Sequence, residues 1–405
     1  MMKKLLIVAI FLTLLAALPA LVAESMLNVS VQMLIAALFA TAFALLCGQA
    51  GMLSFGHAAY FGVGAFATVH AMNAFGGEGL LPTPLLPLVG ALMGLVVGLG
   101  AGYFSTKRTG TYFAMITLAL AELLHSLAPH MRGLFGGEAG ISSFRMPAWG
   151  FEFGSITEVY YLVLFWTVLC IALLWGLTFT PFGRLVLGLR ENTNRLQFLG
   201  YNTHVLGTLV FALSAAFTGV AGGLQAIHIE AANYVFLDAH ISTAVLLNTF
   251  IGGAKVFFGP AIGAATMVFF GHITSDLTRS WLLYQGVIFI LVMMYLPRGI
   301  VGETLACYRG KAGALSWMIL LWRFAGVLVA STGFVLAVEL IQRFFSTDYK
   351  AERMADGWPS ISFAGFDWAP FALGTWGLPL VLITAGIGLI IYINRRGAGQ
   401  QEART

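Results

Sequence analysis

The apolar residues of this chain fall into runs whose length approaches the roughly 20 residues that a helix needs to cross a lipid bilayer. Two of these runs, 57–72 and 240–252, are short for a full crossing. The pattern predicts an all-α, polytopic membrane protein with about 10–12 transmembrane helices, broken or short near residues 47–72 and 240–260. At the upper end of the count the runs are 5–22, 29–46, 57–72, 84–104, 111–128, 160–179, 205–226, 240–252, 258–275, 282–297, 316–341 and 371–393.

The composition fits a membrane protein and excludes a soluble one. Hydrophobic residues make up 59% of the chain and charged residues only 9%, against roughly 25% charged residues in soluble domains. The 48 glycines agree with this, because helices in lipid associate through close approach over small residues. We therefore expect glycine to serve as packing material where helices cross.

Lysine and arginine predict the orientation of the chain. If the N-terminus is inside, the cytosolic segments hold most of the cations, and the opposite loops hold most of the acids that precede the C-terminal region. Both termini are then cytosolic, and the net charge of +4 reflects membrane topology, with no patch for nucleic acid. Residues 1–28 are predicted to form a retained transmembrane helix. A cleaved signal peptide is the less favoured alternative, because its cleavage pattern is weak.

Residues 181–203 form the longest amphipathic, charge-bearing stretch. It lies between two bilayer-length runs and is predicted to be a short helix that ends at Gly200 and docks against a partner in the cytosol. A helix lying on the anionic inner leaflet is the alternative. Its apolar anchors are Leu187, Leu189, Leu196 and Phe198. The residues expected to make the coupling contact are Arg184, Arg190, Glu191, Asn192, Arg195 and Gly200.

The segment 47–62 joins two apolar runs and is rich in glycine, yet it carries Gln49, Ser54 and His57. Irregular backbone at membrane depth is tolerated where it faces protein or a wet cavity, so this segment is the leading candidate to line a translocation path. The alternative is a tight helix crossing mediated by glycine. For Gln49 and His57 the two interpretations are balanced, and for Ser54 the crossing is favoured, because a buried serine commonly bonds to its own backbone.

Two charged residues elsewhere are also candidates. Glu122 and His125 share one face of the predicted helix 111–128, where a carboxylate is either functional or paired. Because Glu122 lies near the outer end of the span, a structural hydrogen bond is favoured over contact with substrate. Lys255 lies in a break between Gly253 and Gly259 that is predicted to be cytosolic. It is either an interfacial anchor or a contact to a gate or to an ATPase.

Several motifs occur in order along the chain. They are Gly48-Gln49, Leu53–Ala59, Thr111–Glu122 with Thr117, Pro181–Arg184, Arg190–Asn192, Leu199-Gly200, Gly252-Gly253, Gly259-Pro260 and Pro297–Gly302. Each is weak alone, but as an ordered set over roughly residues 25–305 the chain resembles the membrane permeases of branched-chain amino-acid (Liv-type) ABC importers. The predicted permease core is 29–305.

The resemblance implies an importer of the bacterial inner membrane. It would contain two homologous permease subunits, two cytosolic ABC ATPase subunits and a periplasmic solute-binding protein. Residues 181–203 would be the coupling helix that inserts into the ATPase. The resulting candidates for the translocation path are Gln49, Ser54, His57, Thr117 and Glu122. One departure concerns Asn194, Arg195 and Leu196, where such permeases tend to carry Glu-Ala-Ala, and it points to a dedicated ATPase partner.

Motifs for catalysis do not occur in the sequence. There is no Gly-x-x-x-x-Gly-Lys-Ser/Thr phosphate loop, no HExxH and no Gly-x-Ser-x-Gly elbow. The three cysteines have no CxxC or other metal-ligand spacing. We therefore expect a protein that is not an enzyme and holds no cofactor or metal, so the energy for transport must come from separate subunits.

Residues 306–405 extend beyond the resemblance. They are predicted to add two transmembrane helices joined by an aromatic-rich external loop, about 345–370. Aromatic residues there most often form an interfacial belt, and a docking surface for the binding protein is the alternative.

Together these features predict the permease subunit of an ABC importer for branched-chain amino acids or a related small polar or carboxylate solute. The alternative from another class is a stand-alone, ion-coupled secondary transporter. Such carriers usually place ionisable pairs at the membrane midplane, and this chain shows few.

Overall fold

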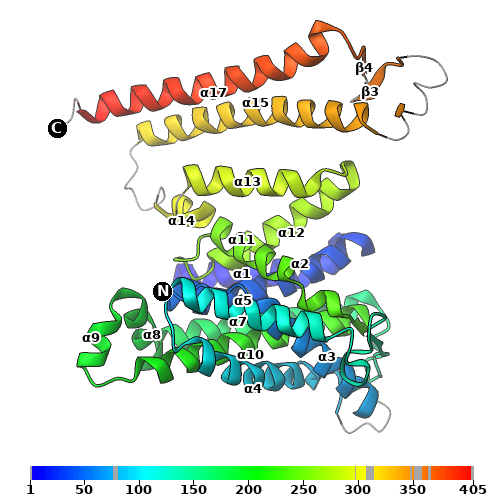
Figure 1. Cartoon of the computed structure of the whole chain (residues 1–405), viewed down its shortest axis with the longest axis vertical. Coiled ribbons are helices and arrows are strands. Elements are labelled where there is room, and N and C mark those ends of the chain that lie inside the picture. The colour runs from blue at the N-terminus through cyan, green and yellow to red at the C-terminus, as the bar shows by residue number, and fades with distance from the viewer. Residues whose placement is uncertain are drawn as a thin grey trace. The chain divides into compact units, whose positions relative to one another are not determined.

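The structure, a computed structural model, describes residues 2–75, 81–296, 298–306, 314–346, 349–350, 358–363 and 366–402. A helix coincides with each of the twelve apolar runs (Figure 1). These helices are α1 (Met2–Leu21), α2 (Glu24–Ala44), α3 (His57–Phe75), α4 (Pro87–Ser105), α5 (Thr111–Leu127), α7 (Ile156–Phe179), α10 (Thr203–Ile229), α11 (Ala239–Gly252), α12 (Gly259–Leu277), α13 (Trp281–Tyr295), α15 (Ala314–Phe344) and α17 (Leu373–Glu402).

The lengths of the helices confirm an all-α membrane protein. Within the described residues, seven helical segments are long and apolar enough to cross a bilayer, and three shorter apolar helices accompany them. The long segments are Glu24–Gln49, Thr83–Ser105, Ile156–Phe179, Thr203–Ile229, Trp281–Leu305, Ala325–Phe344 and Leu373–Ile393. The shorter ones are Leu12–Leu21, Thr111–Leu127 and Ala239–Gly252.

Shorter elements connect these helices. They are the π-helix η1 (Leu45–Gln49), the 3-10 helices η2 (Thr83–Leu85) and η3 (Tyr234–Leu237), and the short helices α6 (Arg132–Phe135), α8 (Pro181–Glu191), α9 (Thr193–Phe198) and α14 (Gly299–Ala306). Two small antiparallel sheets pair β1 (Ile141–Ser142) with β2 (Ala231–Ala232) and β3 (Ile361–Phe363) with β4 (Phe366–Trp368). The sequence pattern did not predict these strands, because two or three residues are too few to show an alternation.

The chain divides into two compact units. The first unit holds residues 1–273 and 285–303, and the second unit holds residues 274–284 and 304–405.

Helices α4 and α10 pack closely against each other in the first unit and lie side by side in Figure 1. Buried glycines recur every four residues along α4, at Gly90, Gly94, Gly98 and Gly102. A Cβ at Gly94 would collide with the backbone carbonyl of Ala215, and one at Gly219 would collide with that of Gly90. Glycine therefore allows the two backbones to touch, as the membrane composition led us to expect.

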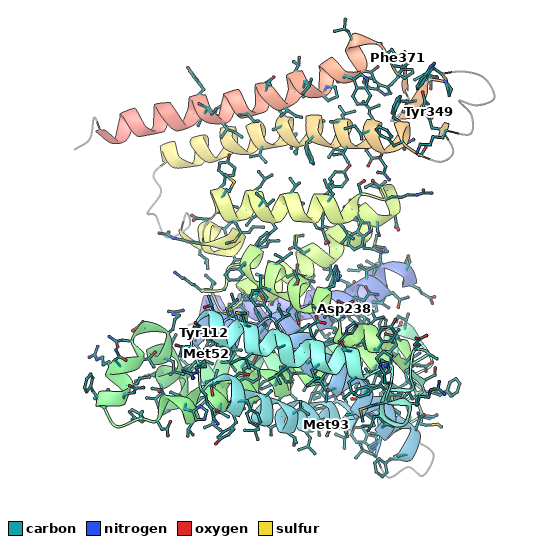
Figure 2. All side chains as sticks on the ribbon, in the orientation of Figure 1. Met52, Met93, Tyr112, Asp238, Tyr349 and Phe371 are labelled. Carbon is teal, nitrogen blue, oxygen red and sulfur yellow. The ribbon has the colours of Figure 1, made fainter. Side chains whose placement is uncertain are left out.

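The opposite face of α4 is apolar and exposed. Leu92, Val96 and Phe104 lie on it, together with Met93, which is labelled in Figure 2. A helix that presents small residues to its neighbour and large apolar residues outward is suited to contact with lipid on its outer side.

Helix α1 contains Pro19, which has no amide proton to donate to the carbonyl of Leu15 one turn earlier. The hydroxyl of Tyr160 on α7 donates to that carbonyl at 2.7 Å, and the next tyrosine, Tyr161, donates to the carbonyl of Ala16 at 3.0 Å. Helix α7 thus supplies the hydrogen bond that the proline removes. This matters in a membrane, where no water is present to replace it.

The predicted breaks are present at both places. Helix α2 ends in the π-helix η1, residues 50–56 have no helical structure, and α3 begins at His57. Helix α11 has 14 residues and ends at Gly252. The backbone then turns through Gly253 (φ 109°) before α12 starts at Gly259.

The second unit is built around a helical hairpin of α15 and α17. A Cβ at Gly326 or Gly333 on α15 would collide with residues of α17, and a Cβ at Gly386 would collide with Ala330. Small residues therefore bring these two helices together as well.

The predicted aromatic loop is partly folded into a cluster. Phe344 packs with Tyr349, Trp358 and Trp376 at ring-centroid separations of 5.6, 5.9 and 6.3 Å. The ring of Phe371 packs edge-on against Trp358 at a centroid separation of 4.8 Å, and its side chain is otherwise exposed (Figure 2). Residues 347–348, 351–357 and 364–365 of the predicted loop, and Pro297 of the last motif, lie outside the described residues.

Candidate functional site

Three segments that are distant in sequence meet around a cavity of about 190 Å³ in the first unit. The π-helix η1 contributes Gln49, helix α8 contributes Arg190, and the break between α11 and α12 contributes Lys255. The sequence predicted these three residues for three separate roles, in a path, a coupling contact and a gate. The structure places them on one cavity.

Glycine makes this junction possible. A Cβ at Gly48 would collide with the backbone carbonyl of Ala254, so η1 and the break are in backbone contact. Gly51 has φ 72°, in the left-handed region that favours glycine, and a Cβ there would come within 2.7 Å of Cγ of Arg190. The segment 48–51 therefore packs directly against both Ala254 and Arg190.

Arg190 ties α8 to the end of α2. Its Nη1 donates to the carbonyl of Gly48 at 2.6 Å. Carbonyls at a helix C-terminus lack partners within the helix and carry partial negative charge, so a guanidinium there makes a charge-assisted hydrogen bond. Arg190 thus contacts its own chain, although the sequence suggested only a contact to a partner.

The prediction of a single helix over 181–203 was wrong. Helix α8 ends at Glu191, and Asn192, in an extended conformation, starts α9 by accepting the amide proton of Arg195 on Oδ1 at 3.0 Å. Asparagine is a strong N-cap, which explains the break at this position. Gly200 (φ 88°) ends α9, as the sequence predicted.

The two short helices bury one predicted anchor and expose another. Leu196 is buried and faces Gly188 of α8. Phe198 is 92% exposed, and Leu199 and Tyr201 are exposed beside it. We call Phe198, Leu199 and Tyr201 the α9 tip. Arg184, Glu191, Asn192 and Arg195 are also exposed along this segment.

His57 and Ser54 are fully buried and do not line the cavity. The hydroxyl of Ser214 donates to the carbonyl of Ala42 at 2.7 Å, so it accepts from Nε2 of His57 at 2.9 Å. The imidazole is therefore assigned as the neutral Nε2–H tautomer, and Nδ1 accepts from Ser54 Oγ at 3.0 Å. The chain of hydrogen bonds joins the 50–56 segment, α3, α10 and α2.

Aromatic rings enclose the same imidazole. Phe43, Tyr60 and Phe211 meet it edge-on or nearly so, with ring centroids 5.0, 5.5 and 5.6 Å away. A polar side chain in such surroundings is stable only if its nitrogens are satisfied, and both are. His57 and Ser54 are therefore part of the packing between helices in this structure, and their role in a path stays a prediction.

Two candidates lie on α5, on different faces. Thr117 is buried, and its hydroxyl accepts the amide proton of Phe55 at 3.2 Å and donates to the carbonyl of Ala114. Glu122 is about half exposed and lies 3.9 Å from Nδ1 of His125. Thr117 therefore contacts the 50–56 segment, whereas Glu122 lies on another face of α5.

Sequence reasoning missed Ser214 and Ser242. Ser242 of α11 accepts the amide proton of Ala58 at the start of α3 at 2.8 Å, and Ser214 bonds to His57. Each lies more than 150 positions from its partner, and single serines in apolar helices are common, so the sequence carries no signal for either contact.

These features can be set against known proteins. A family model described as the permease component of branched-chain amino acid transport systems matches residues 25–296. The chain belongs to this permease family. The match covers α8, α9 and the cavity, and it ends before α15.

Individual relatives of this permease are distant. It is 25% identical over 339 residues to the high-affinity branched-chain amino acid transport system permease protein LivM of Escherichia coli K12, covering 77% of this chain and 78% of that protein. It is 26% identical over 277 residues to the probable branched-chain amino acid transport permease protein LivM of Methanocaldococcus jannaschii, covering 60% of this chain and 78% of the relative. No solved structure matches it.

Membership of the family shows which general class of protein this chain is. Members are transmembrane subunits without ATPase activity, so this permease is a multi-pass membrane protein and not an ATPase. The family also implies ATPase subunits and a binding protein as partners.

Proposed function

We propose that this permease forms the translocation path of an ABC importer for branched-chain amino acids or a related small polar or carboxylate solute. A periplasmic binding protein delivers the solute, and separate ATPase subunits drive its passage. The solute class rests on the transport systems for which the relatives are named. The observation that carries the mechanism is the hydrogen bond from Arg190 to Gly48, because it connects the predicted cytosolic segment to η1 at the end of α2.

The α9 tip is the proposed contact to the ATPase. Phe198 and its neighbours offer apolar side chains to a groove, and the exposed Arg195 and Glu191 lie along the same segment. Such a helix-in-groove contact can transmit a rigid-body displacement. Because Asn192 divides the segment, α9 makes the contact to the ATPase, while α8 makes the contact to Gly48 within the permease.

Arg190 then passes the displacement inward. A shift of α8 pulls on the carbonyl of Gly48, and Gly48 is in backbone contact with Ala254 next to Lys255. We propose that the cavity among Gln49, Arg190 and Lys255 is the cytosolic gate region. When ATP closes the ATPase dimer, the two coupling segments approach each other, and the permease changes from inward-open to outward-open.

The exposed face of α5 is proposed to lie toward the path and the second permease subunit. Tyr112 (Figure 2), Met115 and Leu118 are exposed on this helix, and the carboxylate of Glu122 is exposed among them. A carboxylate facing lipid would be costly, so a second subunit or water should cover this face. The buried residues Ser54, His57 and Thr117 would stabilise the helices that form the wall of the path without lining it.

The proposed location is the bacterial inner membrane with both ends of the chain in the cytosol. The cations Arg184, Arg190, Arg195 and Lys255 all belong to the segments around the proposed gate, which agrees with the positive-inside rule.

The test is uptake of L-leucine by cells that carry Arg190→Ala in the complete transporter. A charge-assisted hydrogen bond contributes about 1.5–3 kcal/mol, so we expect uptake to fall about tenfold or more. Arg190→Lys should retain part of the activity, because an ammonium can still donate to Gly48.

Arg184→Ala, on the same helix and with the same change of charge, is the control and should reduce uptake less. The ATPase subunits should remain bound to the Arg190→Ala variant, since the α9 tip is intact. Normal uptake by Arg190→Ala would contradict the proposed link.

A further inference from the structure

The second unit contains a polar pocket of about 480 Å³. It is formed by residues 275–279, the last turns of α15, Ser346 and Tyr349 just after α15, and residues 360–362 at the start of β3. Eleven of its thirteen lining residues are polar or charged, and only Leu277 and Ile361 are aliphatic. Helix α15 and strand β3 lie beyond the residues that the family model matches.

Glu339 is the central group of the pocket, with a side chain only 7% exposed. Its Oε1 accepts the hydroxyls of Thr278 and Tyr284, the latter at 2.9 Å. Its Oε2 lies 3.9 Å from Nε of Arg343, beyond the length of a hydrogen bond. A carboxylate accepts about four hydrogen bonds, so the second oxygen retains capacity for a further donor.

Hydrogen bonds hold the walls of this pocket in place. Ser280 Oγ donates to Gln342 at 2.6 Å, Arg343 Nη1 donates to the carbonyl of Ser362 at 2.7 Å, and the hydroxyl of Tyr349 donates to the carbonyl of Pro359 at 2.8 Å. Tyr349 also packs in the aromatic cluster with Phe344. The pocket is therefore preorganised, which lowers the entropic cost of binding a ligand.

The lining chemistry indicates the class of ligand. Acidic and basic side chains are balanced, with Asp276 and Glu339 against Arg279 and Arg343, and four serines add hydroxyl groups. A lining with this many charged and hydroxyl groups favours a hydrophilic ligand over a lipid tail or an apolar side chain. An ammonium suits Glu339, and a carboxylate suits the exposed Arg279 at the rim.

We propose that this pocket binds a small hydrophilic zwitterion, such as a polar α-amino acid. The ammonium group of the ligand contacts Oε2 of Glu339, and its carboxylate contacts the guanidinium at the rim. None of the residues that line this pocket lines the cavity among Gln49, Arg190 and Lys255.

Isothermal titration of the full-length chain in lipid nanodiscs tests this proposal. L-serine should bind with saturation. Its methyl ester, which lacks the carboxylate, and N-acetyl-L-serine, which lacks the ammonium, should each bind about tenfold or more weakly. L-leucine should also bind more weakly than L-serine, because its aliphatic side chain cannot form hydrogen bonds with a polar lining.

Glu339→Gln should weaken binding of L-serine by about tenfold or more. Asp367→Asn, an exposed acid of the same unit that does not line the pocket, is the matched control and should bind normally. Arg279→Gln, at the exposed rim, offers a second variant that does not disturb the buried network. Absence of saturable L-serine binding, or wild-type affinity in both Glu339→Gln and Arg279→Gln, would overturn the proposal. Leucine uptake by these variants, measured in parallel, reports on the transport function independently.

Discussion

His57 is a polar residue placed among aromatic rings inside a membrane protein, and its two serine partners make that placement possible. Ser54 and Ser214 satisfy one ring nitrogen each, and they come from an irregular segment and from α10. Since no water is available there, the three side chains stabilise one another as a unit.

We expect His57→Phe to destabilise the protein because it leaves the hydroxyl of Ser54 buried without its partner. An unsatisfied buried hydroxyl costs about 1–3 kcal/mol, so the midpoint of thermal unfolding in detergent should fall by several degrees. The control is His240→Phe, at an exposed position.

A double variant sharpens this test. Ser214→Ala and His57→Phe combined should cost less than the sum of the two single changes, because both remove the same hydrogen bond. Additive effects would show that the hydrogen bond between His57 and Ser214 contributes nothing to the stability of the protein.

Little of this network could be predicted from the sequence. The glycine-rich composition around Gln49 and His57 marked the segment as irregular, which the structure bears out. It did not reveal Ser214, which lies 157 positions away, because contacts of that kind depend on how the helices pack.

At the scale of elements, small residues decide which helices touch. The buried glycines of α4 face α10, whereas a Cβ added at Gly100 on the same helix would meet no atom within 4 Å. The two kinds of glycine therefore occupy different environments on one helix.

Gly94→Ala should destabilise the protein, because the added methyl collides with the backbone of α10. Gly100→Ala should be neutral or stabilising by up to about 1 kcal/mol, because alanine favours a helix over glycine. Thermal unfolding of the two variants measures the difference. Equal stability would show that the α4–α10 crossing does not depend on glycine.

The exposed α9 tip allows a test of the proposed coupling contact without disturbing the fold. Phe198→Asp should leave the stability of the permease unchanged, because the side chain is almost fully exposed, yet it should release the ATPase subunits during a salt wash of the membranes. Phe144→Asp, at another exposed phenylalanine, is the control. Retention of the ATPase after Phe198→Asp would place the contact elsewhere.

Helices were predicted well because each apolar run is a local property of the sequence. All twelve runs are helical, including the short ones. The break between α8 and α9 was missed although Asn192, a strong N-cap, was a visible signal for it. The cavity could not be predicted, because Gln49, Arg190 and Lys255 meet only through the packing of glycine-rich turns.

At the scale of the whole molecule, we propose that this permease obtains its energy from separate ATPase subunits. The family match supports the class of protein, and we propose that the segment of α8 and α9, linked to Gly48 by Arg190, is the physical route for the energy. We propose that the separate binding protein largely determines which solute is transported.

Affinity purification of the tagged chain from its native membrane, followed by mass spectrometry, tests this claim most directly. We predict that ATPase subunits and a second permease will be recovered in near-equal amounts with the chain. The contradicting result is recovery of the chain alone or as a homo-oligomer, with the same outcome for the Phe198→Asp variant. Uptake would then follow an ion gradient.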